Sequence, residues 1–447
     1  MTRQYDRRDF LRLGVTAGAG LALHGTSVAD DEEPRKTSPA KTKAPPIDRV
    51  RIAMVGVGGR GHHLVELLLG LEGVEIRAVC DIVEERVAKA QQLVKKAGQA
   101  KPRGYSRGDT DFVRLCEQED VDLIVAATPW RWHVPVCVAA MEAGKHAATE
   151  VPAAVTIDEC WQLVETAEKT RKHCVMLENC CYGRTEMIVL NMVRQGVLGE
   201  LIHAEAGYLH DARDHLSQQG EVSWRLENLI RRNGNLYPTH GLGPVAQCMN
   251  IDRGDRFDYL VSMSSKSRGL KLRYKEKYGP DHPRTTQKYA LGDVNVSLIH
   301  TVNGATMTLV FDTQLPRPYS RINIVQGTRG IVQGYPERIY IDGRSPRHDW
   351  ETLDKYYAEY DHPLWKALRE RAEGKGHGGM DYMMLYRLVK CLRTGAPPDM
   401  DVYDAASWSV VSALSEQSVA NRSQPVDFPD FTRGKWKTNP PLGIVGA

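Results

Sequence analysis

The sequence contains no hydrophobic run long enough to cross a membrane and no marked excess of charge of either sign. Its 447 residues carry 59 Lys and Arg against 56 Asp and Glu, a formal net charge of +3. Residues 1–45 hold 8 of the basic and 6 of the acidic residues, so the rest of the chain is almost neutral. A spanning helix needs about 18 to 20 apolar residues, and nucleic-acid binding needs a basic field. We therefore expect neither a stable membrane association of the mature chain nor a nucleic-acid partner.

Cysteine also lacks the spacing of a metal or redox motif. None of the 9 cysteines forms a C-x-x-C pair, which argues against zinc, so we expect no metal site. Their number is odd and most lie among apolar residues, which predicts buried, mostly reduced thiols. The length of the chain exceeds what one compact core usually holds and predicts two domains of roughly 150 to 200 residues each.

Residues 1–29 have the pattern of an export signal. Arg7-Arg8 precedes a mild apolar run, and the small residues Ser27 and Ala29 stand where a signal peptidase would cut after position 29. This pattern resembles a twin-arginine signal and predicts a periplasmic or secreted protein. The alternative is a cytoplasmic protein with a frayed basic tail. Residues 30–47 mix Pro, Lys, Thr, Asp and Glu, and predict a disordered linker.

Residues 48–178 predict a Rossmann dinucleotide-binding domain. The short apolar strand VRIAMVG leads into Gly56, Gly58 and Gly61, which match G-x-G-x-x-G before an apolar helix. These glycines allow a pyrophosphate to approach N–H groups at the helix N-terminus. A second strand, VEIRAVCD, ends in Asp81, 20 residues after Gly61. A carboxylate there accepts hydrogen bonds from ribose hydroxyls and repels a 2′-phosphate, so we expect NAD as cofactor. The alternative is a doubly wound fold without a nucleotide.

The carboxyl ends of the strands should form the cofactor crevice. TPWRWH follows the third core strand, VDLIVAATP, which places Trp130 and His133 near that crevice. Trp130 and Trp132 are equally well explained as packing residues.

The segment ATEVPAAVTIDECWQLVETAEKT resembles the Gfo/Idh/MocA superfamily of Rossmann-fold oxidoreductases, typified by glucose–fructose oxidoreductase and inositol dehydrogenase. In that superfamily a Glu-Lys-Pro motif closes the nicotinamide site, whereas Glu150-Val151-Pro152 lacks the lysine that assists hydride transfer. Further stretches resemble glycoside hydrolase family 109, the NAD-dependent α-N-acetylgalactosaminidases: MLENCCYGR, GELIHAEAGYLHD, NGNLYPTHGLGPVAQCMNI, PRPYSR and GHGGMDY. This resemblance covers nearly everything from about residue 48 onward.

The resemblance implies an exported glycosidase that hydrolyses terminal α-N-acetylgalactosaminyl or related residues by transient oxidation. NAD takes hydride from C3, a base removes the acidified C2 proton, and the glycosidic oxygen leaves by elimination. Water then adds at C1 and the hydride returns, a route unlike that of glycosidases with two carboxylates. Because the cofactor ends as it began, an exported enzyme could work with one tightly held NAD, and the twin-arginine route carries proteins already folded.

Residues 179–447 predict an α+β domain with an open, mainly antiparallel sheet whose face covers the nicotinamide crevice. We expect an amphipathic helix near residues 184–196 and strands at LIHAEAGYL and FDYLVSMS. Asn303-Gly304 between two β-rich runs predicts a hairpin with a type I′ turn. The last helix, near residues 402–420, should pack back onto the first domain.

The resemblance also assigns catalytic roles. His240 would be the base for the C3 hydroxyl, since imidazole titrates near neutrality, or else a histidine that caps the next helix. Tyr182 is similar to the family residue that removes the C2 proton, which would need a nearby cation to lower its pKa from about 10. Its alternative is a buried tyrosine with a satisfied hydroxyl. Glu150 and Tyr319 would assist departure of the leaving group or addition of water.

The remaining contacts implied by the resemblance fall into two sets. The cofactor set, in which Asn179 would contact the nicotinamide ribose, is Gly56, Gly58, Gly59, Arg60, Gly61, Asp81, Trp130, His133, Glu150, Val151 and Asn179. The substrate set, which would hold hydroxyls or the acetamido group, is Tyr208, Arg225, Tyr237, His240 and Tyr319. Arg225 and Arg321 are equally well explained as solvated or ion-paired, and we expect a structural role for His377 and Asp381 of GHGGMDY.

Two other functions stay open. One is a sugar dehydrogenase of the same superfamily, against which the missing lysine and the export signal argue. The other is a non-catalytic NAD- or sugar-binding module, which would leave the set of Glu150, Tyr182, Tyr237, His240 and Tyr319 unexplained. A glycan or glycoside is the expected partner, and a homo-oligomer is compatible with the sequence.

Overall fold

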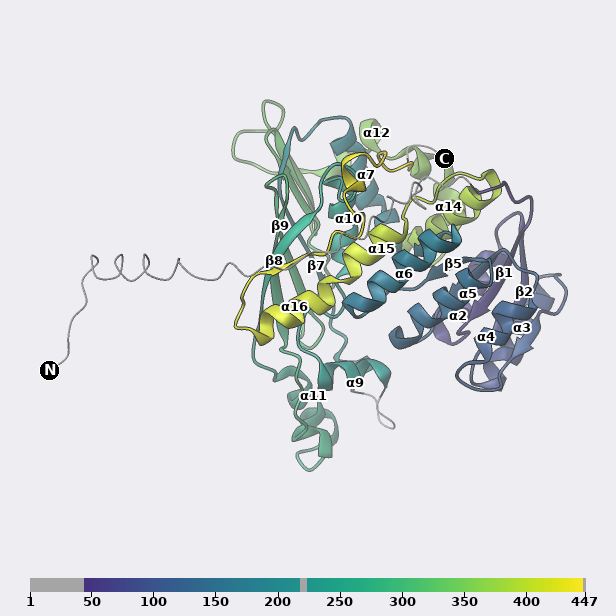
Figure 1. The fold of residues 1–447 in the computed structure, drawn as a ribbon. Helices are drawn as coiled ribbons and strands as arrows, with labels where there is room; N and C mark the ends of the chain where they lie inside the picture. The colour runs from purple at the N-terminus through teal and green to yellow at the C-terminus, as the bar shows by residue number, and fades with distance from the viewer. Residues whose placement is uncertain (1–43, 218–222, 445–447) are drawn as a thin grey trace, which may run out of the picture. The chain divides into compact units, whose positions relative to one another are not determined.

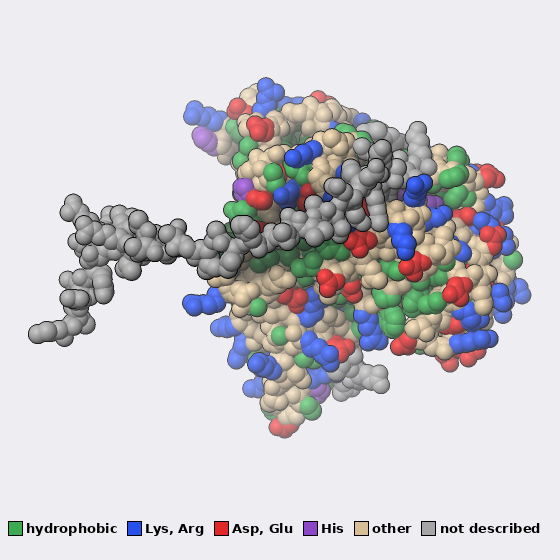
Figure 2. Space-filling view, viewed as in Figure 1, with side chains coloured by type: hydrophobic (Ala, Val, Ile, Leu, Met, Phe, Trp, Pro, Cys, Tyr) green, Lys and Arg blue, Asp and Glu red, His purple; other side chains and the backbone are tan. Residues whose placement is uncertain are grey.

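The computed structural model describes residues 44–217 and 223–444 (Figure 1). The predicted signal at 1–29 and most of the predicted linker at 30–47 lie outside the described residues, so export stays a prediction. Within the described ranges, no helix combines the length and the apolar character that a membrane span requires. Basic and acidic side chains are interspersed over the visible face, in keeping with the small net charge (Figure 2).

The first half contains a six-stranded parallel sheet in the order β3-β2-β1-β4-β5-β6. The strands of its centre are short and buried because helices cover both faces of a parallel sheet. The strands are β1 (Val50–Val55), β2 (Val74–Cys80), β3 (Arg103–Tyr105), β4 (Leu123–Ala126), β5 (His146–Thr149) and β6 (Cys174–Met176). The helices are α2 (Gly59–Leu69), α3 (Glu84–Lys96), α4 (Asp111–Gln118), α5 (His133–Glu142) and α6 (Ile157–Thr170). The predicted Rossmann domain is confirmed, and the strand order reverses between β1 and β4, where ligands of such sheets bind.

The second half contains a nine-stranded sheet in the order β14-β13-β12-β11-β7-β10-β9-β8-β15. All neighbours pair antiparallel except β7 and β10, which are parallel, so the mainly antiparallel sheet is confirmed. Its strands are β7 (Leu201–Leu209), β8 (Phe257–Ser264), β9 (Val294–Thr301), β10 (Thr306–Asp312), β11 (Ile324–Gly327), β12 (Gly330–Gly334), β13 (Glu337–Ile341), β14 (Glu351–Thr352) and β15 (Val426–Asp427).

Helices cover one face of this sheet. In β9, buried residues alternate with half-buried or exposed ones, the pattern of a strand with one covered face. Helix α10 packs on β7 and α16 on β8. The helices are α7 (Arg184–Arg194), α8 (Arg213–Leu216), α9 (Trp224–Arg231), α10 (Thr239–Cys248), α11 (Gly269–Tyr278), α12 (Tyr357–Tyr360), α13 (Pro363–Ala372), α14 (Met380–Thr394), α15 (Val402–Ser409) and α16 (Val411–Ala420).

The segment expected to form one last helix forms two, which pack on different partners. Helix α15 lies on α6 and β6 of the Rossmann half, while α16 lies on β8 of the second sheet (Figure 1). Only α15 therefore packs back onto the first domain. The expected hairpin joins β9 and β10, but its predicted type I′ turn is wrong. Type I′ needs two left-handed residues, and of Asn303 and Gly304 only Gly304 has a positive φ, 94°.

All nine cysteines are buried and none is in a disulfide, so the prediction of buried, reduced thiols is confirmed. Burial raises the pKa of several of them, among them Cys80 to about 12, which keeps these thiols protonated and unreactive.

Candidate active site

The glycine-rich turn between β1 and α2 accepts only glycine at two positions. Gly56 has a φ of 84°, and a Cβ atom there would lie 2.6 Å from the carbonyl oxygen of Ala127. A Cβ atom on Gly61 would lie 1.8 Å from the carbonyl oxygen of Gly56. The turn thus brings the first N–H groups of α2 to the edge of the sheet without side chains in the way, as a bound pyrophosphate requires.

Asp81 ends β2 at the same edge. Its two carboxylate oxygens accept hydrogen bonds from the backbone N–H groups of Val57 and Val83, both at 3.0 Å. These bonds fix the carboxylate beside the glycine-rich turn, where its free lone pairs suit ribose hydroxyls. Arg86 approaches Asp81 to 3.5 Å.

A cavity of about 580 Å³ opens at the carboxyl ends of the strands, within the usual range for a small-molecule or cofactor site. Most of the predicted cofactor set lines it, while Gly61 and Asn179 do not. Residues of the second half close its other side. The lining includes Gly56, Gly58, Gly59, Arg60, Asp81, Trp130, His133, Glu150, Val151, Trp224, Arg225 and Tyr237. Its size, the glycine turn and the placement of Asp81 fit a dinucleotide.

His133 lines this cavity, and both of its ring nitrogens lie close to backbone carbonyl oxygens. Its Nδ1 lies 2.8 Å from the carbonyl oxygen of Pro152 and its Nε2 lies 2.9 Å from that of Thr128. The side chain is fully buried, and burial lowers its pKa. His133 therefore lies at the crevice as predicted, and its ring nitrogens lie against the backbone around the strand ends; a contact with the cofactor stays a prediction.

Trp130 lies at the crevice and also packs against other rings, so both of its interpretations fit its position. It lines the cavity, and its ring contacts Trp224 edge-on at 5.0 Å and stacks on Tyr237 at 5.9 Å. Arg225 lies over Trp224, 4.4 Å from the ring centroid, without an ion pair to any described residue. Arg225 is thus a cation held by aromatic faces at the cavity wall, where it can meet substrate hydroxyl or carbonyl oxygens.

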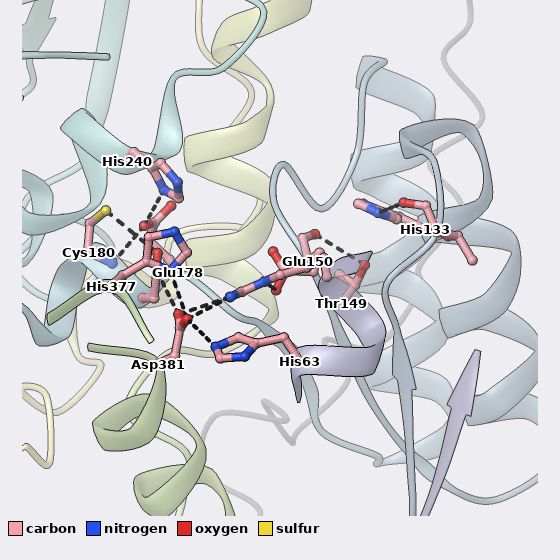
Figure 3. Close-up of polar contacts among 12 residues, drawn as sticks. His63, His133, Thr149, Glu150, Glu178, Cys180, His240, His377 and Asp381 are labelled. Atoms are coloured by element: carbon pink, nitrogen blue, oxygen red, sulfur yellow. Dashed lines mark hydrogen bonds and ion pairs between the residues drawn. The ribbon is translucent and has the colours of Figure 1, made fainter. Parts of the chain in front are cut away.

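His240 is backed by a buried carboxylate that the sequence analysis did not select. Glu178 follows β6, and its Oε1 accepts a 2.7 Å hydrogen bond from Nδ1 of His240 (Figure 3). Burial would raise the pKa of Glu178, but the charge and hydrogen bond of His240 outweigh it and hold that pKa below its usual range. An ionised Glu178 requires the proton of the neutral imidazole to sit on Nδ1, which leaves Nε2 as the basic atom.

Aromatic rings surround His240. Tyr208 and Tyr237 lie 5.4 Å and 4.9 Å from it, centroid to centroid, and Tyr319 lies 6.1 Å from Tyr208. The predicted substrate residues Tyr208, Tyr237, His240 and Tyr319 therefore come together, and Tyr237 joins them to the cavity wall. Burial raises the pKa of Tyr208 to about 12, so its hydroxyl stays a neutral hydrogen-bonding group.

Tyr319 is held by a cation. Arg321 donates a 3.0 Å hydrogen bond from Nη1 to the Tyr319 hydroxyl oxygen, and its Nη2 donates at 2.6 Å to Glu186. Burial raises the pKa of Tyr319 above its usual value, and the charge and hydrogen bond of Arg321 offset only part of that increase. Of the two roles considered for Arg321, the structure shows the ion-paired one.

Tyr182 does not have the environment expected of a base. It is 3% exposed, and its hydroxyl donates a 3.0 Å hydrogen bond to Asp399, which also binds Arg387. Burial and the Asp399 carboxylate raise the pKa of Tyr182 well above its usual value. The prediction that a cation activates this phenol is wrong, because the Asp399 carboxylate raises the pKa of Tyr182 by more than the Arg387 guanidinium lowers it.

Asn179, expected at the nicotinamide ribose, is engaged elsewhere. Its amide donates a 2.7 Å hydrogen bond to Asp381. Asp381 also receives two hydrogen bonds from Arg60, which donates at 2.6 Å to Glu150 (Figure 3). Asp381 thus has the structural role expected of it, as a partner of Arg60, and Arg60 also pairs with Glu150 at the cavity wall.

Among the described residues, one set could ligate a metal ion: Glu178, Cys180 and His240, whose ligand atoms lie within 4.8 Å of one another. No metal site was predicted, because the cysteine spacing is local and these three residues are not all neighbours in the sequence. In the structure Oε1 of Glu178 is hydrogen-bonded to Nδ1 of His240, and burial raises the pKa of the Cys180 thiol well above its usual value. The set is better explained as a base with its orienting carboxylate than as a metal centre.

Sequence reasoning missed Glu178, and one signal could have found it. It stands two residues after a core strand of the parallel sheet, at the edge where ligands bind. A charged residue so close to a buried strand needs a partner.

Comparisons with known proteins agree with this site. Residues 50–178 match the model of the oxidoreductase family with an NAD-binding Rossmann fold, and residues 182–438 match that of the glycosyl hydrolase 109 C-terminal domain. A glycosyl hydrolase family 109 protein of Solibacter usitatus is 52% identical over 440 residues, covering 98% of this chain and 99% of its own. One of Shewanella putrefaciens is 50% identical over 456 residues, covering 99% of both.

Solved structures with the same fold are more distant in sequence. An NAD-binding oxidoreductase from Klebsiella pneumoniae superposes with a TM-score of 0.67 at 17% identity, covering 86% of this chain and all of its own. An inositol dehydrogenase homologue from Azotobacter vinelandii, complexed with NAD+, gives 0.65 at 19% identity, with 86% and 98% covered. These likenesses show the Gfo/Idh/MocA fold, and NAD is the cofactor of the first domain. From the match of its C-terminal half and from its full-length relatives, this chain belongs to glycosyl hydrolase family 109 and is an NAD-dependent glycoside hydrolase.

Proposed function

We propose that this chain is an exported glycosidase that removes terminal α-N-acetylgalactosaminyl, or closely related, residues through transient oxidation at C3. The observation that carries the proposal is the Glu178–His240 pair, a histidine base with a buried carboxylate behind it, next to a dinucleotide cavity. A glycosidase of the usual kind would instead need two carboxylates facing each other across the glycosidic bond.

When bound, NAD supplies an acceptor for the C3 hydride and later returns it. Gly56 and Gly61 keep the turn open for its pyrophosphate, and Asp81 would accept hydrogen bonds from its ribose. As the hydride leaves C3, Nε2 of His240 takes the proton of the C3 hydroxyl. The carboxylate of Glu178 stabilises the positive charge that then forms on the imidazole ring.

The C3 ketone acidifies the proton on C2. We assign its removal to Tyr319, since Arg321 donates to its oxygen and stabilises the negative charge of a phenolate. The electron pair of the C2–H bond forms the C1–C2 double bond, and the C1–O bond breaks. The leaving oxygen takes a proton from water.

Hydrolysis is completed by addition of water. Glu150, paired with Arg60, accepts a proton from the water that adds to C1 and passes it to the hydroxide that remained when the leaving oxygen was protonated. Tyr319 returns a proton to C2, and His240 returns one to the C3 oxygen as the hydride comes back. Arg225 and Tyr237, at the cavity wall, would hold the hydroxyls and the acetamido group of the sugar.

Turnover in D₂O tests this route. Deuterium should appear at C2 of the released sugar, whereas direct displacement at C1 leaves C2 untouched. The same reaction should proceed without added cofactor. A requirement for continual supply of NAD, with an oxidised sugar as product, would instead identify a sugar dehydrogenase of the same superfamily.

The substrate needs a separate test. A panel of nitrophenyl α- and β-glycosides, with and without the 2-acetamido group, should give the highest kcat/KM for α-N-acetylgalactosaminide. One well-placed hydrogen-bonding pair is enough to discriminate epimers. A plain glucoside as the best substrate would refute the proposed specificity and leave the oxidative route standing.

A further inference from the structure

Asp381 collects four hydrogen bonds at a fully buried position. It lies in the first turn of α14, and its carboxylate accepts from Nη1 and Nη2 of Arg60 at 2.7 and 3.0 Å. Asn179 donates to it at 2.7 Å and Nδ1 of His377 lies 2.8 Å away (Figure 3). Burial opposes its ionisation, but the hydrogen bonds from His377 and Arg60 outweigh this and hold the pKa of Asp381 well below its usual range.

These bonds join parts of the chain that are far apart in the sequence. Arg60 belongs to the glycine-rich turn and lines the cofactor cavity, whereas Asp381 lies 321 residues later in the second half. The same guanidinium donates from Nε to Glu150 at 2.6 Å. Arg60 is therefore fixed between two carboxylates, and without Asp381 it would keep only the one on the cavity wall.

The first glycine of GHGGMDY permits this contact. Gly376 has a φ of 69°, and a Cβ atom there would lie 2.5 Å from Oδ2 of Asp381 and 2.6 Å from Nε2 of His63 on α2. Only a residue without a side chain lets the loop before α14 bring Asp381 so close to α2. Gly374, in the same loop, has a φ of 72° but nothing within 4 Å of its Cβ position.

We propose that Asp381 is a positioning residue. Through its contact with Arg60, which we call the latch, it holds the second half of the chain against the glycine-rich turn and so slows release of the bound dinucleotide. The latch rests on NAD as the cofactor and not on the proposed glycosidase chemistry. Its failure would therefore leave the oxidative route untouched, and failure of the route would leave the latch untouched.

Release of NADH measures the latch directly. Protein loaded with NADH is mixed with a large excess of NAD, and the loss of nicotinamide fluorescence gives the dissociation rate. Asp381→Asn keeps the shape of the side chain but removes the charge that holds Arg60, and should speed release by about tenfold or more. Asp361→Asn, which removes a similar buried carboxylate paired with Arg184 away from the cavity, should release NADH at the wild-type rate.

The two glycines supply a matched pair that leaves the carboxylate in place. Gly376→Ala should speed release as Asp381→Asn does, because the new methyl group displaces the carboxylate. Gly374→Ala carries the same backbone strain without that contact and should not. This pair also decides the matter if Asp381→Asn fails to fold. Wild-type release from Asp381→Asn, or equal release from the two glycine variants, would overturn the latch.

A double-mutant cycle shows whether Asp381 acts through Arg60. Arg60→Lys loses the forked donor and should also speed release. Because the two residues form one unit, the double variant should release NADH no more than about threefold faster than Arg60→Lys alone. Two effects that multiply would mean that Asp381 acts on the fold in general and would refute a positioning role.

Discussion

Replacing Glu178 by glutamine removes one charge from the site and almost no volume. Oε1 of Glu178 accepts from Nδ1 of His240 at 2.7 Å and from the backbone N–H of Cys180 at 3.0 Å. Glutamine can accept both bonds with its own oxygen, so the imidazole ring keeps a partner. What disappears is the negative charge that stabilises His240 once it has taken the proton of the C3 hydroxyl.

The size of the effect follows from the burial of this pair. A hydrogen bond to a charged group contributes about 1.5 to 3 kcal/mol, against about 1 kcal/mol for a neutral one. Glu178 is fully buried, so solvent does not screen its charge. In the proposed route His240 takes up a proton as the hydride leaves C3, so the loss of the Glu178 charge should lower kcat more than it changes KM. The glutamine amide can also donate a hydrogen bond to Nδ1 of His240, which would place the imidazole proton on Nε2 and remove the base. Together these effects should lower kcat by roughly 10²–10³-fold.

The assay separates oxidation from later steps. The variant, loaded with NAD, is mixed with an aryl glycoside, and the absorbance of reduced nicotinamide is followed before steady state. Its appearance should slow by the same factor as kcat, while NADH release stays unchanged. Asp361→Asn again serves as the control. A Glu178→Gln enzyme within about threefold of wild type would refute the role of Glu178 and His240 as a unit, since losses that small are typical of substitutions remote from a site.

Four further outcomes are expected. His240→Ala should lower kcat by roughly 10²–10⁴-fold. The folded variant should still contain bound NAD, because the glycine-rich turn is intact; denaturing it and assaying the released nicotinamide measures this. Tyr182→Phe should keep wild-type kcat and lose about 1 to 2 kcal/mol in denaturant unfolding, because Arg387 still pairs with Asp399; a loss of turnover would restore Tyr182 as the base. Asp81→Asn should raise the NADP-to-NAD affinity ratio at least about tenfold by freeing Arg86 from the carboxylate; an unchanged ratio in ligand titrations would contradict the placement of the ribose. The pKa of Asp381 is lower in the folded than in the unfolded state, so its ionised form stabilises the fold above the unfolded pKa near 3.9, and this stabilisation is lost as the pH falls toward the folded pKa. The difference in Tm between wild type and Asp381→Asn should therefore be smaller at pH 3 than at pH 7. A larger difference at pH 3 would contradict this prediction.

The sequence predicted the elements of the fold better than their arrangement. The apolar runs at β1 and β4 identify strands covered on both faces, and the alternation in β9 marks one covered face. These patterns are local. The parallel contact between β7 and β10 joins strands about a hundred residues apart, and no local pattern encodes such a pairing.

The site shows the same division. Gly56, Gly61 and Asp81 were found because a dinucleotide imposes local spacing on them. Tyr182 was misjudged because its partner, Asp399, lies 217 residues away and carries the opposite charge to the one expected. Arg60 and Asp381 were seen separately but not together. Tertiary packing decides which buried polar groups lie next to each other. Residue type therefore identified many of the site residues but did not predict their hydrogen-bond and ion-pair partners.

Those partners explain why one crevice can hold several proton-transfer groups at once. Each side chain that transfers a proton in the proposed route has a buried or half-buried partner of opposite charge or a hydrogen-bonding partner: Glu178 for His240, Arg321 for Tyr319, and Arg60 for Glu150. A route through oxidation, elimination, addition and reduction needs each group to give and take a proton within one turnover, without drifting between steps. Partners fixed by burial meet that need, because they hold the reacting atom in place while leaving one face free for the sugar. The proposed role of Asp381 fits this route, because an enzyme that regenerates its NAD in every turnover has no need to exchange the cofactor and benefits from its slow release.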